Sequence, residues 1–256
     1  MAVHCFTPDG WPAGVRVATT TRAGGVSREA FASLNLGDHV GDEPDAVRVN
    51  RQRLAQALPG DVSVNWLAQE HGTQVVKASA TAAAATTPVA DACWTDRPRL
   101  ACAVLTADCL PVLLCSGDGR TVAAVHAGWR GLVAGVIEAT VRAVASDPRD
   151  LHVWLGPAIG PAAFEVGAEV REAFIRAAHA AGRDRQADAA CFQPGLRPDR
   201  YLADIVALAR VRLGALGVSR IQTDSRCTVS EPDAFYSFRR DGRTGRMASL
   251  VYIDPA

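Results

Sequence analysis

The stretch Leu105-Thr106-Ala107-Asp108-Cys109-Leu110-Pro111 opens the part of the chain that decides the fold. It leads into two apolar runs, 112–115 and 121–125, separated by the Gly- and Asp-rich segment 116–120. Two short apolar runs around such a segment are typical of a β-hairpin. The second run ends in His126-Ala127-Gly128-Trp129-Arg130-Gly131. If Cys115 pairs with Thr121, Cys109 falls within about a residue of opposing His126, where cross-strand Cβ atoms lie roughly 4.5–5.5 Å apart.

The predicted hairpin therefore brings a thiol and an imidazole together at its open end. The two groups would be close enough to share a metal ion or a proton. The alternative interpretation is a buried cysteine beside a core histidine. Polar, turn-rich segments flank both Cys109 and His126, and they favour the functional interpretation.

The composition is that of a globular enzyme. The 256 residues are 48% hydrophobic and 21% charged, and we expect one domain spanning residues 1–256. The formal net charge is zero, which predicts no attraction to nucleic acid or to an anionic membrane. Seven cysteines without a CxxC motif, and no signal-peptide pattern at the start, predict reduced thiols and a cytoplasmic location.

Strands and helices are predicted in a mixed order. A helix is predicted after Asp42, its expected cap, with Pro44 in the first turn, and another from Asp199 to Gly217. The apolar spacing over 130–144 and 169–181 predicts two more helices. The remaining predictions are strands at 15–21, 64–68, 74–78, 100–105, 151–155, 218–222 and 247–253, turn character at 90–96, and loop or weak helix at 80–87. Because strict β-α-β alternation is missing, we expect an α+β fold with mixed sheets flanked by helices.

Several common catalytic motifs are absent from the sequence. It contains no GxGxxG, no Walker A, no HExxH, no GxSxG and no zinc-deaminase signature. It has six histidines and no HxH pair, which argues against a multicopper oxidase of the usual kind.

A third candidate ligand is His71, which precedes Gly72 at a predicted turn between two strands. A lone histidine on a turn is usually polar surface, so its candidacy depends on convergence with Cys109 and His126. Two imidazoles and one thiolate suit a catalytic Zn²⁺ with an open fourth position, and Cu²⁺ can use the same donors. The turn 128–131 before a predicted helix, with Arg130, could bind an anion, although its glycines could equally serve close packing.

Nine segments of the sequence match a known bacterial family. They are residues 19–27, 35–42, 50–51, 66–72, 90–92, 106–111, 126–131, 156–160 and 235–241. On these segments the chain resembles the YfiH or laccase-domain family, also named peptidoglycan editing factor or multicopper polyphenol oxidase. The matching segments run nearly from end to end of the chain.

The resemblance implies a fold, an activity and a set of site residues. The expected fold has α/β/β/α layers and is similar to that of a toxin deamidase that uses Cys and His. The expected activity is phosphorolysis of adenosine, inosine and methylthioadenosine, with deamination of adenosine. The implied site residues are the metal ligands His71, Cys109 and His126 and the substrate contacts Arg51, Arg130, Asn35 and Gln69.

Our leading hypothesis is therefore zinc-assisted chemistry on purine nucleosides, with phosphate held by Arg130 or Arg51. We expect small-molecule partners and a monomer or weak homodimer. A second hypothesis needs no metal: Cys109 is a nucleophile, His126 its base and Asp108 or His71 the orienting group, for amide hydrolysis on a peptidoglycan precursor. Copper-dependent phenol oxidation is a third hypothesis, ranked as a side activity. A structural metal site in a binding protein is the fourth.

Overall fold

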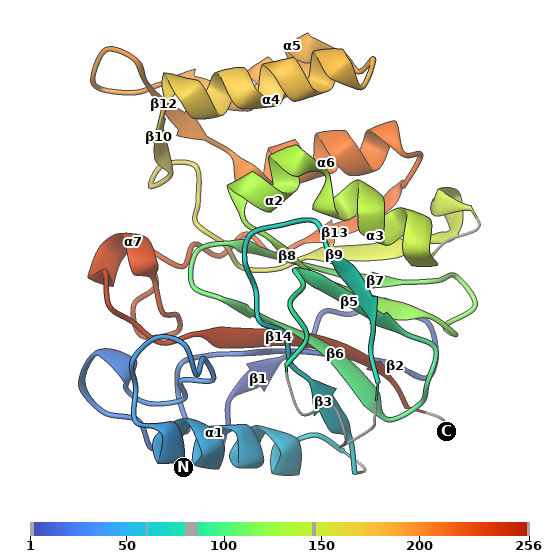
Figure 1. Ribbon diagram of the computed structural model, residues 1–256, viewed down its shortest axis with the longest axis vertical. Helices are drawn as coiled ribbons and strands as arrows, with labels where there is room; N and C mark the ends of the chain where they lie inside the picture. The colour runs from blue at the N-terminus through green and yellow to red at the C-terminus, as the bar shows by residue number, and fades with distance from the viewer. Residues whose placement is uncertain (1–2, 60, 80–86, 145–146, 255–256) are drawn as a thin grey trace.

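Two stacked β-sheets form the centre of the computed structural model, which describes residues 3–59, 61–79, 87–144 and 147–254 (Figure 1). The six-stranded sheet has the order β13 (Arg220–Thr223), β9 (His152–Leu155), β7 (Leu110–Cys115), β8 (Val122–Ala127), β5 (Ala92–Thr95) and β4 (Val75–Lys77). The five-stranded sheet has the order β1 (Cys5–Phe6), β2 (Val15–Thr20), β14 (Met247–Ile253), β6 (Leu100–Thr106) and β3 (Ser63–Asn65). Parallel and antiparallel pairs occur in both sheets.

Helices cover both outer faces of this pair of sheets (Figure 1). The six-stranded sheet is covered by α2 (Trp129–Ala134), α3 (Val136–Val144) and α6 (Ile205–Ala215), and the five-stranded sheet by α1 (Pro44–Ala57). At the top of Figure 1, α4 (Ala168–Ala180) and α5 (Arg185–Ala189) accompany a small sheet of β10 (Glu165–Gly167), β12 (Arg200–Ala203) and β11 (Phe192–Pro194). The remaining helices are α7 (Phe238–Asp241) and two 3-10 turns, Glu29–Phe31 and Pro148–Asp150. The predicted α+β fold with α/β/β/α layers is confirmed.

No helix in the described part of the chain combines the length and apolar character that crossing a membrane would require.

The core consists of apolar layers between these sheets and helices. Strand β7 is buried on both faces because it lies in the middle of the stack. Its Val112 and Leu114 point to the helix side, and Leu113 and Cys115 point to the five-stranded sheet. The alternation follows from the two-residue period of a strand, and it explains why the sequence of β7 is apolar throughout.

The predicted hairpin is present, with its register shifted by one residue. Cys115 pairs with Val122 and Pro111 pairs with His126, so the predicted pairing of Cys115 with Thr121 is wrong. The loop is longer by one residue because Thr121 closes the turn, its carbonyl accepting the N–H of Ser116. Cys109 consequently lies beyond the end of the ladder.

Strand β6 belongs to the other sheet and does not extend the hairpin sheet. Residues 107–109 therefore cross from the five-stranded sheet to the six-stranded one. Asp108 has φ 90°, a left-handed conformation that allows the abrupt change of direction. The crossing places Cys109 at the junction of the two sheets.

Several predicted element boundaries differ from the structure. The helix over 130–144 is two helices, because Gly135 has φ 102° and ends α2. The helix predicted from Asp199 begins at Ile205 and is capped by Asp204, because Arg200–Ala203 forms β12. The segment Ala92–Thr95, predicted as a turn, is strand β5. The Ala/Thr-rich run predicted as loop or weak helix lies, for residues 80–86, outside the described residues.

The N-terminus of α1 also differs from the prediction. Asp42 does not cap the helix, because its carboxylate accepts from the Ser27 hydroxyl and the Asn35 amide. Pro44 stands at the start of α1 as predicted.

Replacing Leu113 by Ala tests the layer between the sheets. Leu113 is fully buried there, so Leu113→Ala should reduce the free energy of unfolding by about 2–5 kcal/mol through lost burial and the cavity left behind. Urea denaturation measures the change. Leu196, which is 100% exposed, provides the control, and Leu196→Ala should change the stability little. Equal effects of the two substitutions would contradict this description of the core.

Candidate metal centre

His71, Cys109 and His126 converge from three separate segments. His71 lies on the turn before β4, Cys109 on the crossing between the sheets, and His126 near the end of β8. Their candidate ligand atoms all lie within 4.8 Å of one another. Sγ of Cys109 is 3.8 Å from Nε2 of His71, and the two imidazole rings meet edge to face with centroids 4.7 Å apart. Across the described ranges, these three form the one group of three or more such side chains with this proximity.

Asp91 positions both histidines. Its Oδ1 accepts the Nδ1–H of His126 at 2.8 Å and the backbone N–H of His71 at 2.9 Å. Its Oδ2 accepts the backbone N–H groups of Gly72 at 2.6 Å and Glu70 at 3.2 Å. His71 itself has φ 62°, and these three N–H bonds hold the turn in that unusual conformation. With Nδ1 of His126 engaged, its Nε2 is the nitrogen left for the cluster.

Sequence reasoning did not assign this role to Asp91, and it named Asp108 or His71 as the orienting group. The Asp108 alternative is wrong. The Asp108 carboxylate accepts from the Thr228 hydroxyl and from the backbone N–H of Arg239, both at 2.6 Å, and so braces the loop before α7. The sequence feature that could have identified Asp91 is its position just before β5, because β5 pairs with β8, the strand that carries His126. It was missed because Ala92–Thr95 was predicted as a turn.

The cluster stabilises a thiolate. Burial opposes ionisation of Cys109, but His126 and His71 outweigh it and lower the pKa of the thiol to about 6. Burial likewise opposes the imidazolium of His126, yet the Cys109 thiolate and the Asp91 carboxylate raise its pKa to about 9. Without a metal, the pair is therefore a thiolate beside an imidazolium near neutral pH. The thiolate is also the form that binds metals.

The donor set fits a transition metal. Two imidazole nitrogens and one thiolate sulfur are ligands that suit both zinc and copper. The Asp91–His126 hydrogen bond is the arrangement by which proteins commonly fix the orientation of a metal-binding histidine. Gly128 leaves the necessary room, because a Cβ at this position would lie 2.7 Å from Cδ2 of His71 and 3.0 Å from Sγ of Cys109.

The cluster faces a cavity of about 270 Å³. Its other walls include His39, Gln69, Thr106, Phe238 and Arg246. Of the four predicted substrate contacts, only Gln69 lines this cavity. Its side-chain amide is already paired with the backbone N–H and carbonyl of Leu105, at 2.7 and 2.8 Å, so it also fixes the end of β6.

The other three predicted substrate contacts lie outside the cavity walls. Arg51 pairs with Asp38 at 3.1 Å and lies over the Trp66 ring. Arg130 is exposed and lies over the ring of Trp129. Asn35 is fully buried, and its amide bonds to Gly37, Asp42 and the backbone N–H of Arg246. We therefore assign Asn35 to positioning of the polypeptide around the cavity, not to contact with substrate.

Arg246 is the arginine that lines the cavity, and sequence reasoning missed it. Met247 pairs with Thr106, so Arg246 falls beside the crossing that carries Cys109. Its guanidinium donates to the carbonyls of Thr244 and Gly245, and it forms no ion pair with a carboxylate in the described segments. Burial lowers the pKa of Arg246, and the negative charges of Cys109 and Asp108 oppose that shift. The signal was its position directly before the predicted strand 247–253, but the pairing of that strand with the predicted strand 100–105 was not predicted.

Replacing Asp91 tests whether one carboxylate holds both histidines. Asp91→Asn should weaken metal binding about 10- to 100-fold, the usual effect of removing a hydrogen-bond partner of a ligating histidine. Competition with a chromophoric chelator measures the metal affinity. Asp96→Asn is the matched control, because Asp96 is an exposed partner of Lys77. Unchanged affinity in Asp91→Asn would refute the role given to this carboxylate.

Known proteins resemble this chain over nearly its whole length. The family model described as multi-copper polyphenol oxidoreductase laccase matches residues 16–254. A protein of Pseudomonas aeruginosa named purine nucleoside phosphorylase is 52% identical over 250 residues, covering 97% of this chain and 98% of that protein. The Escherichia coli purine nucleoside phosphorylase YfiH is 50% identical over 242 residues, covering 94% and 95%.

A solved structure supports the same relationship. The crystal structure of a Neisseria meningitidis protein of the family DUF152 superposes with a TM-score of 0.89 and is 47% identical, covering 98% of this chain and 99% of that one. The sequence matches extend over nearly the whole chain, and the layered fold is shared. The chain belongs to the laccase-like YfiH family, as its sequence motifs predict.

Proposed function

We propose that the protein is a zinc-dependent purine nucleoside phosphorylase that acts on adenosine, inosine and methylthioadenosine and also deaminates adenosine. The observation that carries the proposal is the meeting of two features in one cavity. The metal-binding cluster forms one part of the wall, and Arg246, which has no carboxylate partner among the described residues, forms another. The names of the relatives supply the substrate class.

Phosphorolysis requires a held anion. An oxygen of phosphate forms a bond to C1′ of the ribose while the bond from C1′ to the purine nitrogen breaks. The proton lost by hydrogen phosphate passes to the departing base, so the products are free purine and ribose 1-phosphate, or 5-methylthioribose 1-phosphate when methylthioadenosine is the substrate. A guanidinium presents paired donors that match phosphate oxygens, and it acts more strongly where water is excluded. Arg246 is the residue in this cavity with that chemistry, so we assign the phosphate to Arg246 in place of Arg130 or Arg51.

The cluster serves the second reaction. A zinc ion bound by His71, Cys109 and His126 would supply the Lewis acidity that activates water for deamination. Asp91 keeps Nε2 of His126 directed toward the cluster and holds the turn that carries His71. His39 lines the same cavity with its side chain 52% exposed. The partial burial of the ring and the Arg246 charge lower its pKa, which favours the neutral imidazole as a hydrogen-bonding group.

A second candidate function needs no metal. Asp91, His126 and Cys109 follow one another as an orienting carboxylate, a base and a nucleophile, an arrangement that suits attack on an amide carbonyl. The family resemblance suggests a peptidoglycan precursor as the amide substrate. Asp91 takes the place that Asp108 had in the sequence-based version of this hypothesis. Activity that survives chelation would support this candidate.

Copper-dependent phenol oxidation ranks below both candidates. Four-electron reduction of oxygen by a multicopper enzyme needs several copper ions, and the residues described here offer one three-ligand cluster. We therefore treat phenol oxidation as a side activity. A purely structural metal is also disfavoured, since the cluster opens onto a cavity.

Metal analysis tests the zinc assignment. Protein purified without added metal should contain close to one zinc per chain, and Cys109→Ala should lose most of it because one of three ligands is gone. Mass spectrometry of metal content measures both. Cys115→Ala is the control, because Cys115 is the last residue of β7, the strand that follows Cys109, and is buried in the core. A metal-free wild type that remains active in chelator would move the assignment to the nucleophilic cysteine.

Steady-state kinetics test the phosphate site. Arg246→Met should raise the phosphate KM about tenfold or more, the scale expected for losing charge-assisted hydrogen bonds. Adenosine deamination should be much less affected, because that reaction uses no phosphate. Arg130→Ala should leave phosphorolysis and the phosphate KM unchanged. The reverse pattern, in which Arg130→Ala raises the phosphate KM and Arg246→Met does not, would assign the phosphate to Arg130.

A further inference from the structure

A second, smaller cavity of about 130 Å³ lies on another side of Cys109. It shares Ala107, Cys109 and Phe238 with the larger cavity, so the two adjoin at the cluster. The rest of its wall is mainly apolar, made by Trp129, Ile159, Phe164 and Ile205, with Asp108 and Arg239 as its two charged members. The four apolar residues come from α2, from the loop after β9 and from the start of α6. A mainly apolar cavity and a more polar one therefore meet at Cys109.

Phe238 at this meeting point is unusually exposed. It is 60% exposed, and Val89 and Leu196 are the other large apolar residues in the described ranges with comparable exposure. Phe238 is the first residue of α7 and contributes to both cavities. An aromatic ring that remains open to water beside a cavity gains stability when a flat apolar surface covers it.

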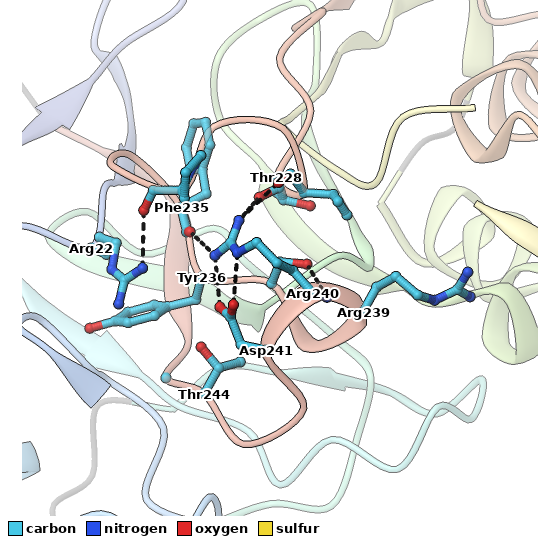
Figure 2. A network of polar contacts seen from close by, with 12 residues as sticks. Arg22, Thr228, Phe235, Tyr236, Arg239, Arg240, Asp241 and Thr244 are labelled. Atoms are coloured by element: carbon cyan, nitrogen blue, oxygen red, sulfur yellow. Dashed lines mark hydrogen bonds and ion pairs between the residues drawn. The ribbon is translucent and has the colours of Figure 1, made fainter. Parts of the chain in front are cut away.

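The backbone that carries Phe238 is firmly held. Figure 2 shows Arg240 bonded to the carboxylate of Asp241 and to the carbonyls of Thr228 and Phe235. The Ser237 hydroxyl caps α7 by accepting the N–H of Arg240, and Asp108 accepts the N–H of Arg239. Phe238 thus stands between two anchored neighbours, and its backbone is held at the wall that the two cavities share with Cys109.

We propose that the apolar cavity is the subsite for the purine base, with the ring of Phe238 stacked against it. This inference rests on the proposed function and extends it. Small-molecule sites usually measure roughly 300–1,000 Å³, and each cavity alone is smaller, so a nucleoside must use both. Ribose and phosphate need polar partners, which the larger cavity offers in His39 and Arg246. The base, with two apolar faces, suits the aromatic walls.

The arrangement also orders the ligand across the site. With the base against Phe238 and the phosphate at Arg246, the ribose lies over Cys109, where the two cavities join. The bond between base and sugar then falls at the boundary between the apolar and the polar cavity. Arg239 lines the apolar cavity as well, and it is the residue there with charged N–H donors for the acceptor nitrogens on the edge of a purine.

Binding of free hypoxanthine, without phosphate, tests the subsite independently of turnover. Hypoxanthine should quench tryptophan fluorescence, and Trp129→Phe should remove most of the change, because Trp129 lines the cavity. Phe238→Ala should weaken hypoxanthine binding about fivefold or more, the lower bound for base–aromatic stacking. Leu196→Ala, which removes an apolar side chain that is fully exposed elsewhere, should have no effect.

Ribose 5-phosphate provides the complementary probe. Its binding should weaken in Arg246→Met and stay unchanged in Phe238→Ala, whereas hypoxanthine should show the opposite pattern. Equal hypoxanthine affinity in wild type and Phe238→Ala, or quenching that persists at full amplitude in Trp129→Phe, would overturn the proposal.

Failure of the subsite and failure of the proposed function give different results. If phosphorolysis occurs with a nucleoside KM that is unaffected by Phe238→Ala, the subsite is wrong and the function stands. If hypoxanthine binds as expected but no phosphate-dependent cleavage occurs, the subsite stands as a purine site and the phosphorylase assignment fails.

Discussion

One buried carboxylate, that of Asp91, holds both histidines of the cluster. It accepts four hydrogen bonds, three from consecutive backbone N–H groups and one from the ring of His126. A carboxylate removed from water is costly unless its oxygens are paired, and here both oxygens are. The same bonds that stabilise the charge of Asp91 therefore fix the positions of His71 and His126. Asp91 thus determines both the positions of the two histidines and the negative charge beside them.

The third ligand depends on the stacking of the two sheets. Cys109 stands where the chain leaves β6 in one sheet and enters β7 in the other, and Asp108 secures this crossing by bonding to Thr228 and Arg239. Arg246 reaches the same place because β14 pairs with β6. The cluster, the arginine and the apolar cavity are thus consequences of how the two layers meet. No single local segment could form the site alone.

Much of the fold could be predicted from local patterns. The hairpin around 116–120, strand Met247–Ile253 and the helix beginning at Pro44 are present because apolar periodicity and turn residues act over a few positions. Pairing between distant strands has no local signal in the sequence. The roles of Arg246 and Asp91 depend on such pairing, so they were not predicted. Asn35 and Arg51 belong to recognised motifs and bond to protein groups near the cavity, and a motif does not say whether a residue contacts ligand or backbone. The convergence of His71 with Cys109 and His126 was predicted from chemistry and resemblance, and the structure brings the three together.

The hairpin register has a consequence for which folded state can bind metal. A slip of one residue between β7 and β8 would turn His126 to the opposite face of the sheet, because side chains alternate along a strand. Asp91, which also bonds through its backbone carbonyl to the N–H of His126, would lose its alignment. Only the correctly paired chain then presents three ligands. A bound metal contributes its binding free energy to that pairing alone, and so widens the energy gap between the native structure and its nearest misregistered competitors.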